Sequence, residues 1–81
     1  MNIIWIETEF IKLDQLLKFA EIVDSGGISK ILIQDGFVKV NGDVCVQRGK
    51  KIREADEVEV LIPDEDGNIV ELHQIKVKVK A

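Results

Sequence analysis

The sequence predicts an α+β fold, in which two short packed helices lie against a small, mostly antiparallel β-sheet with extra N- and C-terminal strands. Three observations lead to this prediction. Apolar residues recur at helical spacing between Leu13 and Asp35, and they alternate with polar residues after Gly36. The pair Asn41-Gly42 favours a type I′ hairpin turn, because both central positions of that turn need a positive φ angle.

The helical region is expected to form two helices. A leucine-rich face predicts a first helix of about residues 13–22. Residues 24–27, which read DSGG, interrupt the apolar pattern, and a second helix is expected from about residue 27 to Asp35. Gly36 then closes that helix as a C-terminal cap with positive φ.

The rest of the chain is expected to form strands joined by turns. Residues 2–7 are β-branched and aromatic, which favours a strand, and the end of the chain alternates between apolar residues and lysines. We expect both terminal strands to extend the sheet. The expected order is a strand at 2–7, a hairpin of 37–41 and 43–46, a basic loop at 48–51, a turn at 54–56, a strand at 57–62, a turn at 63–68 and a strand at 69–80.

Positive charge is concentrated in the middle of an acidic chain. The net charge is −4, yet residues 30–53 contain six basic residues and two acidic ones. The segments on either side are acidic, so this distribution indicates a nucleic-acid partner that the net charge alone would not suggest. The six basic residues are Lys30, Lys39, Arg48, Lys50, Lys51 and Arg53.

Composition excludes several function classes. With 81 residues there is room for one domain, and one cysteine with one histidine can form neither an internal disulfide nor a four-ligand zinc site. No apolar run approaches the roughly 20 residues that span a bilayer, and no signal peptide is recognisable, so we expect a cytoplasmic protein without a membrane partner. No catalytic or phosphate-loop motif is present, which predicts a non-enzymatic protein with no cofactor and no small-molecule substrate.

A series of short motifs runs through roughly residues 10–62 in a fixed order. The most specific part is Gly-x-Val-x-Val-Asn-Gly at residues 36–42, followed by Asp-x-Val at residues 56–58. The earlier motifs are Leu13-Asp14, Leu16-Leu17, Ser25, Lys30 with Leu32-Ile33, and Asp35-Gly36. Together they resemble the S4 RNA-binding domain and its αL-like fold. Within that family the chain looks most like the short stand-alone bacterial members sometimes called YaaA-like.

This resemblance implies a surface that holds the phosphate backbone of structured RNA, formed by the second helix and the loop after the hairpin. Several cations on one face are needed there, because attraction to phosphates sums over contacts. Arg48 suits a two-pronged phosphate contact, because its guanidinium is planar. The candidate RNA-binding residues are Lys12, Ser25, Gly26, Gly27, Lys30, Lys39, Arg48, Lys50, Lys51 and Arg53.

The chain also departs from the family pattern. Lys12 stands where many S4 domains have arginine, and Gly26 stands where a further basic residue is common. On the second helix a Lys30-Ile31 pair replaces two consecutive basic residues. We therefore expect a lower RNA affinity than in the more basic relatives. Gly26 and Gly27 either expose amides that hold a phosphate or only permit the turn.

Other residues have two interpretations each. Lys76, Lys78 and Lys80 could form a second row of phosphate contacts, but a solvated or protective edge strand is the more common meaning of alternating lysines. Trp5 could stack on a base, but a place in the core is expected. Packing roles are expected for Phe10, Phe19 and Phe37, a buried inert thiol for Cys45, a structural or exposed place for His73 and a polar turn for Asp64–Gly67.

The leading hypothesis is a protein that binds structured RNA, either ribosomal RNA or a ribosomal subunit, during assembly, maturation or translation. Binding is expected to depend on backbone and shape, since the second helix offers few side chains suited to reading bases. The alternative is a protein-interaction adaptor in which the S4 fold is only a scaffold. The oligomeric state stays open.

Overall fold

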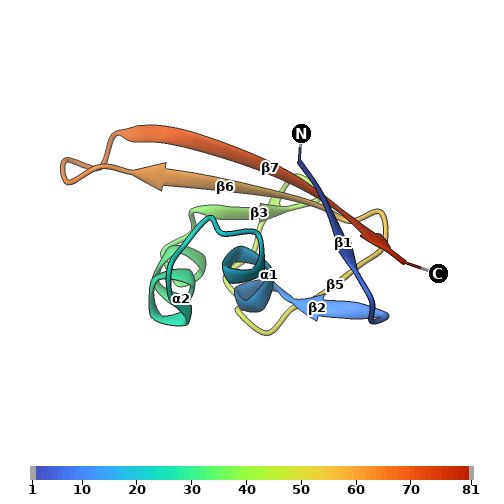
Figure 1. Ribbon diagram of the computed structural model, residues 1–81. Helices are drawn as coiled ribbons and strands as arrows, with labels where there is room; N and C mark the ends of the chain where they lie inside the picture. Colours follow the sequence, from blue (N-terminus) through green and yellow to red (C-terminus); the bar gives the residue numbers. More distant parts are fainter. Residues whose placement is uncertain (1, 81) are drawn as a thin grey trace.

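The computed structural model describes residues 2–80 and contains a five-stranded sheet, a separate two-stranded sheet and two helices. Figure 1 shows both helices and the small sheet on the same side of the large one. This arrangement confirms the predicted fold class. The elements are β1 (Asn2–Ile6), β2 (Phe10–Lys12), α1 (Leu13–Phe19), α2 (Gly26–Gln34), β3 (Val38–Val40), β4 (Asp43–Val44), β5 (Lys51–Arg53), β6 (Glu57–Pro63) and β7 (Ile69–Val79).

The five-stranded sheet has the order β1-β7-β6-β3-β4. Strand β1 runs parallel to β7, and the other pairs are antiparallel. Strand β7 pairs with β1 over Ile75–Val79, where the lysines alternate, and β6 pairs with its other edge only as far as Lys76. The expected edge strand is wrong for Lys76, which has a strand partner on each side, whereas Lys78 has one on the β1 side alone within residues 2–80.

The two-stranded sheet was not foreseen from the sequence. Strands β2 and β5 pair antiparallel and have three residues each, too few to give a recognisable alternation. Ile11 and Ile52 are cross-strand partners, and Ile52 is fully buried while Ile11 packs against the core. This pairing turns part of the expected basic loop into a strand.

The first helix is shorter than predicted. It ends at Phe19 rather than near residue 22, because Glu21 adopts a left-handed conformation with φ of 59°. The second helix agrees with its prediction to within one residue at each end. Its cap Ser25 accepts a hydrogen bond from the Ile28 amide at 3.3 Å, and Gly36 follows it with φ of 85°.

The hairpin turn has the expected conformation, with positive φ at both Asn41 and Gly42. Strand β4 is two residues long, shorter than the predicted return strand of residues 43–46. The polar turn near the end of β6 is also confirmed, since Asp64 Oδ1 accepts hydrogen bonds from the amides of Asp66 and Asn68.

The core lies between the five-stranded sheet and the helices, and it also includes the inner face of the small sheet (Figure 1). Leucines of α1 meet valines and isoleucines from the strands, all removed from water. The fully buried members are Leu13, Leu16, Leu17, Ile33, Val38, Ile52, Val58, Val60, Ile75 and Val77.

Two aromatic residues expected in this core lie outside it. Trp5 is 50% exposed and Phe19 is 58% exposed. On β1 the neighbouring Ile6 is the residue that points into the core, and strand alternation then turns Trp5 away. Phe37 does pack against the core, as expected, while Phe10 is half-buried.

The remaining single residues have local roles. Cys45 is half-buried rather than buried, with its sulfur 3.7 Å from the Gln47 carbonyl oxygen. His73 lies 3.5 Å from a carboxylate oxygen of Glu71. Among residues 2–80, no helix has the length and apolar character needed to cross a membrane.

Candidate nucleic-acid interface

Three cations and one aromatic ring share the outer face of the small sheet. Lys12 is the cross-strand partner of Lys51, and Phe10 is the partner of Arg53. Partners in an antiparallel pair point to the same side, and alternation along each strand puts all four side chains opposite Ile11. The Lys51 Nζ lies 4.8 Å from the centroid of the Phe10 ring, and the Arg53 Cζ lies 5.5 Å from it.

The loop before β5 is fastened to the start of α1. The Leu13 amide donates to the Lys50 carbonyl at 2.9 Å, and the Asp14 amide donates to the Arg48 carbonyl at 3.0 Å. These bonds use helix amides that have no partner within the helix itself. They hold the backbone of Arg48 and Lys50 beside Lys12 while both loop side chains stay exposed. We call Lys12, Arg48, Lys50, Lys51 and Arg53 the basic face.

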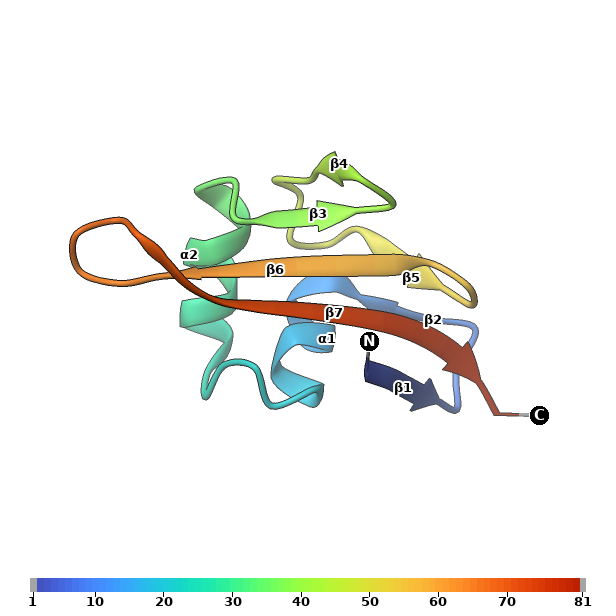
Figure 2. The same ribbon diagram turned by 90° about the horizontal axis from the view of Figure 1, so that it is seen from above.

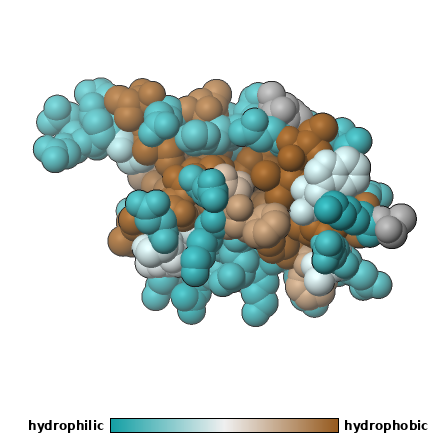
Figure 3. All heavy atoms as spheres, viewed as in Figure 1, coloured by the Kyte–Doolittle hydropathy of each residue, from teal (hydrophilic) through white to brown (hydrophobic). Residues whose placement is uncertain are grey.

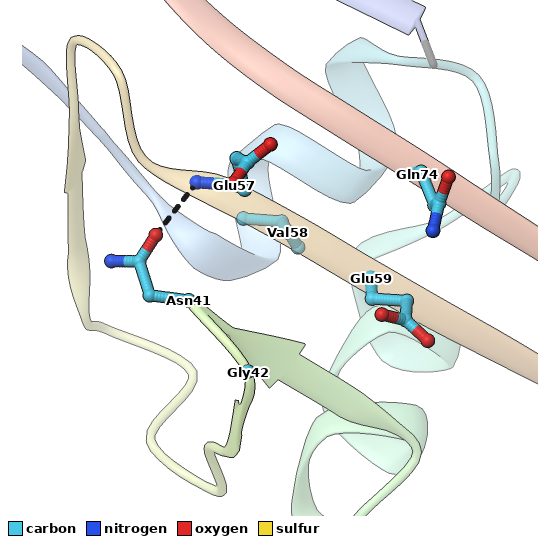
Figure 4. Close-up of a pocket in the computed structure, with 6 residues that line it drawn as sticks. All are labelled: Asn41, Gly42, Glu57, Val58, Glu59 and Gln74. Carbon is cyan, nitrogen blue, oxygen red and sulfur yellow. Dashed lines mark hydrogen bonds between the residues drawn. The ribbon is translucent and has the colours of Figure 1, made fainter.

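A side-chain clamp joins the hairpin turn to the end of β5. Asn41 Oδ1 accepts from the Glu57 amide at 2.9 Å, as Figure 4 shows, and Asn41 Nδ2 donates to Asp56 Oδ1 at 3.0 Å. The other carboxylate oxygen of Asp56 accepts from the Arg53 amide at 2.8 Å. The clamp thus fixes the backbone that carries Arg53. Asn41 and Asp56 were not among the predicted site residues, although both belong to the motifs noted in the sequence.

The start of α2 holds a second group of predicted residues. Ser25 uses its hydroxyl to cap its own helix, and Gly26 and Gly27 lie exposed in the first turn. Neither glycine has positive φ, and a Cβ at either position would meet no atom of residues 2–80 closer than 3.8 Å, so the backbone does not require glycine there. In Figure 2 this end of α2 and the loop before β5 lie on opposite sides of the helical layer. Lys30 is exposed on α2.

Lys39 lies apart from both groups. It is on β3 between the buried Val38 and Val40, so its side chain points away from the helices. Its cross-strand partners are Val44 and Glu59. The ten predicted residues therefore occupy three places, the basic face, helix α2 with its cap, and the outer side of the large sheet.

The sequence matches the S4 domain family over residues 4–80. This protein belongs to the S4 domain family. The match extends beyond the predicted residues 10–62 and takes in most of β1 and all of β7. The S4 protein is also similar to a protein of Bacillus subtilis (strain 168) described as "Probable ribosome maturation protein RlbA". The two are 41% identical over 59 residues, which is 73% of this chain and 83% of the relative.

The positive charges of this S4 domain are not neutralised by neighbouring carboxylates. In the part of the chain that the structure describes, residues 2–80, the one contact of ion-pair length joins His73 and Glu71. No lysine or arginine there has a carboxylate oxygen within the 4.0 Å limit of an ion pair. The cations of the basic face are therefore free to attract an external anion.

The hollow drawn in Figure 4 has a different character. Asn41, Gly42 and Gln74 line it together with the acidic residues Glu57 and Glu59, around a volume of about 400 Å³. Two carboxylates at one opening repel phosphates. This side of the S4 domain is therefore a poor surface for RNA, and Lys39 is poorly placed beside its partner Glu59.

Proposed function

We propose that this S4 domain protein binds structured RNA of a ribosomal particle through the basic face. The observation that carries the proposal is that Lys12, Lys51 and Arg53 share one face of the small sheet with Phe10, with no ion pair to neutralise them in residues 2–80. Such a cluster of like charges is costly unless an anion meets it, and phosphates of folded RNA supply closely spaced anions.

Membership of the S4 family supports an RNA-binding role, and the description of the Bacillus subtilis relative supports a ribosome-related one. The exposed side chains of the basic face are flexible cations with few groups that could read bases. Contacts of this kind position a protein on RNA by backbone and shape. We infer binding to ribosomal RNA or to a subunit during maturation, without catalysis by the protein itself.

Helix α2 offers a second contact to the same RNA. Lys30 is exposed, and the first turn of α2 carries no acidic residue. Because α2 and the small sheet lie on the same side of the large sheet, one RNA could reach both (Figure 1). We propose that the basic face supplies most of the affinity and that Lys30 adds to it.

The first test is co-sedimentation of the tagged protein with ribosomal particles from lysate at low salt. Wild-type protein should appear in subunit fractions, and an Arg48→Glu/Lys51→Glu variant should stay at the top of the gradient. A single Lys51→Glu change should also weaken binding, whereas Lys18→Glu, which alters charge equally at an exposed site on α1, should have a smaller effect. Circular dichroism checks that every variant is folded. Equal sedimentation of wild type and the double variant would refute the proposal.

A protein-interaction adaptor is the second candidate function. Its support is a set of exposed apolar side chains on the first half of β7, a strand that carries none of the residues of the basic face. Val70 is 60% exposed and Leu72 is 53% exposed. An adaptor that uses this part of β7 would retain its protein partner when the charge of Lys51 is reversed by Lys51→Glu. It would lose the partner on Leu72→Ser, a change that the RNA-binding proposal expects to be harmless.

A further inference from the structure

Strand β1 forms an open edge of the five-stranded sheet. It comes first in the order β1-β7-β6-β3-β4, and within residues 2–80 it pairs with β7 alone. Figure 2 shows β1 along one margin of the molecule, with no other described strand outside it. The amides and carbonyls on the open side of an edge strand can pair with a strand of another chain.

The backbone groups on this open edge belong to Ile3 and Trp5. The Lys80 amide donates to the Ile6 carbonyl at 2.8 Å, which continues the parallel register of β1 with β7. Successive residues of a strand direct their backbone groups to opposite edges, so Ile4 and Ile6 direct theirs to β7. Ile3 and Trp5 direct theirs outward, where no group of residues 2–80 hydrogen-bonds to them.

The same two residues have exposed apolar side chains. Ile3 is 49% exposed and Trp5 is 50% exposed, and alternation turns both away from the side on which Ile6 is buried. Figure 3 looks onto this edge and shows hydrophobic atoms at the surface over β1. The five residues of β1 are uncharged, and the strand contains no proline and no bulge that would protect its edge.

The other open edges of the described residues are short or charged. Strand β4, at the far end of the large sheet, has two residues, one of which is Asp43. Strands β2 and β5 have three residues each and carry lysine or arginine. The part of β7 that β1 does not cover contains Glu71 and follows the acidic turn of residues 64–66. Within residues 2–80, β1 is therefore the open edge without a charge.

We propose that β1 pairs with β1 of a second copy of this chain in antiparallel orientation, which joins two five-stranded sheets into one of ten strands. The strand is complementary to itself. When Ile4 lies opposite Ile4 of the other copy, all five residues pair and Ile3 lies opposite Trp5. Each of these two residues then donates and accepts a backbone hydrogen bond across a twofold axis.

The side chains also match in this arrangement. Ile3 beside Trp5 is a pair of a β-branched and an aromatic residue, a combination that stabilises neighbouring strands. On the other face the two Ile4 side chains, which pack against their own cores, meet each other. Lys76 and Lys78 on β7 lie three strand spacings, about 14 Å, from their counterparts, so salt screens their repulsion. A second copy therefore fits this edge without burying a charge.

The interface of two such short strands is small, below the roughly 1,000 Å² that stable complexes bury. We therefore expect a reversible dimer with a dissociation constant on the order of 10 μM. Because the twofold axis is perpendicular to the sheet, both pairs of helices lie on the same side of the joined sheet (Figure 1). Self-association does not require RNA, so its test is independent of the proposed function.

Sedimentation velocity of the full chain without RNA, between about 1 and 300 μM, tests the inference at concentrations below and above that constant. Monomer should convert to dimer as the concentration rises. The protein has one tryptophan, so fluorescence gives a second readout. Its emission should shift to shorter wavelength over the same range, because the second copy removes water from Trp5.

Ile3→Pro removes an outward amide and keeps the hydrogen bonds between β1 and β7, because the Ile3 amide does not point to β7. Ile3→Lys places a charge on the edge. Each should raise the dissociation constant of the dimer at least roughly tenfold. Val44→Lys is the matched control, because Val44 is 56% exposed on β4 at the opposite edge of the sheet, and it should dimerise like wild type. Circular dichroism checks that each variant is folded.

A wild-type chain that stays monomeric over the whole range would overturn the inference. So would a dimer that persists in folded Ile3→Pro and Ile3→Lys, because association would then use another surface. If Val44→Lys abolishes the dimer and Ile3→Lys does not, the contact is at β4 and the inference is wrong.

Discussion

The Phe10 ring helps to position two cations of the basic face. Its ring lies within 5.5 Å of both Lys51 and Arg53, and the electron-rich face of the ring attracts each cation. This attraction offsets part of the repulsion between neighbouring positive charges. The ring therefore acts as a positioning group for the basic face, although the sequence suggested only a packing role.

Replacing Phe10 with leucine should weaken RNA binding by roughly five- to thirtyfold, because two cation–ring contacts of about 0.5–1 kcal/mol each no longer position Lys51 and Arg53. The dependence of affinity on salt should not change, since every cation remains. Phe10→Tyr should restore binding. Titrations at several salt concentrations measure both quantities, and full affinity in the leucine variant would refute the role of the ring.

Replacing each of two serines in the α2 region with alanine should change the free energy of unfolding in opposite directions. Ser29 is fully buried and its hydroxyl has no hydrogen-bond partner within residues 2–80, whereas the Ser25 hydroxyl caps the helix. Ser29→Ala should raise the free energy of unfolding by about 0.5–1.5 kcal/mol, because it removes an unsatisfied polar group. Ser25→Ala should lower it by about 1 kcal/mol. Urea unfolding of both variants gives the comparison, and destabilisation by Ser29→Ala would contradict the first expectation.

At the scale of elements, the small β2–β5 sheet and the clamp decide where the cations point. The sheet places Lys12 opposite Lys51, and the clamp of Asn41 and Asp56 holds the end of β5. The bonds from the α1 amides to the loop carbonyls complete this support. Three chain segments that are distant in sequence thus hold the basic face together.

Removing the Asp56 carboxylate distinguishes the effect of its negative charge on RNA binding from the effect of its hydrogen bonds. By charge alone, Asp56→Ala should strengthen RNA binding, because it deletes an anion beside Arg53. We expect the opposite, a severalfold loss, because two hydrogen bonds that hold Arg53 and Asn41 disappear. The free energy of unfolding should fall by about 1–3 kcal/mol. Stronger RNA binding in a folded variant would show that the clamp does not position the basic face.

At the scale of the whole molecule, an acidic protein carries the basic face, which we propose as its RNA contact, on one small sheet and one loop. The net charge is −4, and long-range attraction to RNA is correspondingly weak. Affinity must then come from close contacts with a few phosphates. Under the proposed function, we therefore expect weak binding to nucleic acid that does not match the shape of the basic face.

The salt dependence of RNA binding should reflect this small number of contacts. If three or four phosphates are engaged, a plot of log affinity against log salt concentration should have a slope of about −2 to −3. Lys51→Ala should make the slope less steep by about one unit or slightly less. Filter binding or fluorescence titration with a ribosomal RNA fragment measures both slopes, and a slope near zero would exclude the electrostatic mechanism.

The sequence alone was sufficient for the features that depend on neighbouring residues. Helical spacing predicted α1 and α2, the pair Asn41-Gly42 predicted the hairpin turn, and the ordered motifs identified the S4 family. These features follow from local periodicity and from the φ angles that each residue type tolerates. The left-handed Glu21 that ends α1 early has no such local signal.

Only the tertiary structure decided which sides of the elements are covered. Phe10 pairs with Arg53, Lys39 faces away from the helices, and β1 lies beside β7 and leaves Trp5 exposed. Local alternation determines that a strand has two faces, but long-range pairing and register determine which face meets the core. For that reason the sequence by itself determined the family and the main elements and supplied the candidate cations, and the fold decided how those cations are grouped and which aromatics stay exposed.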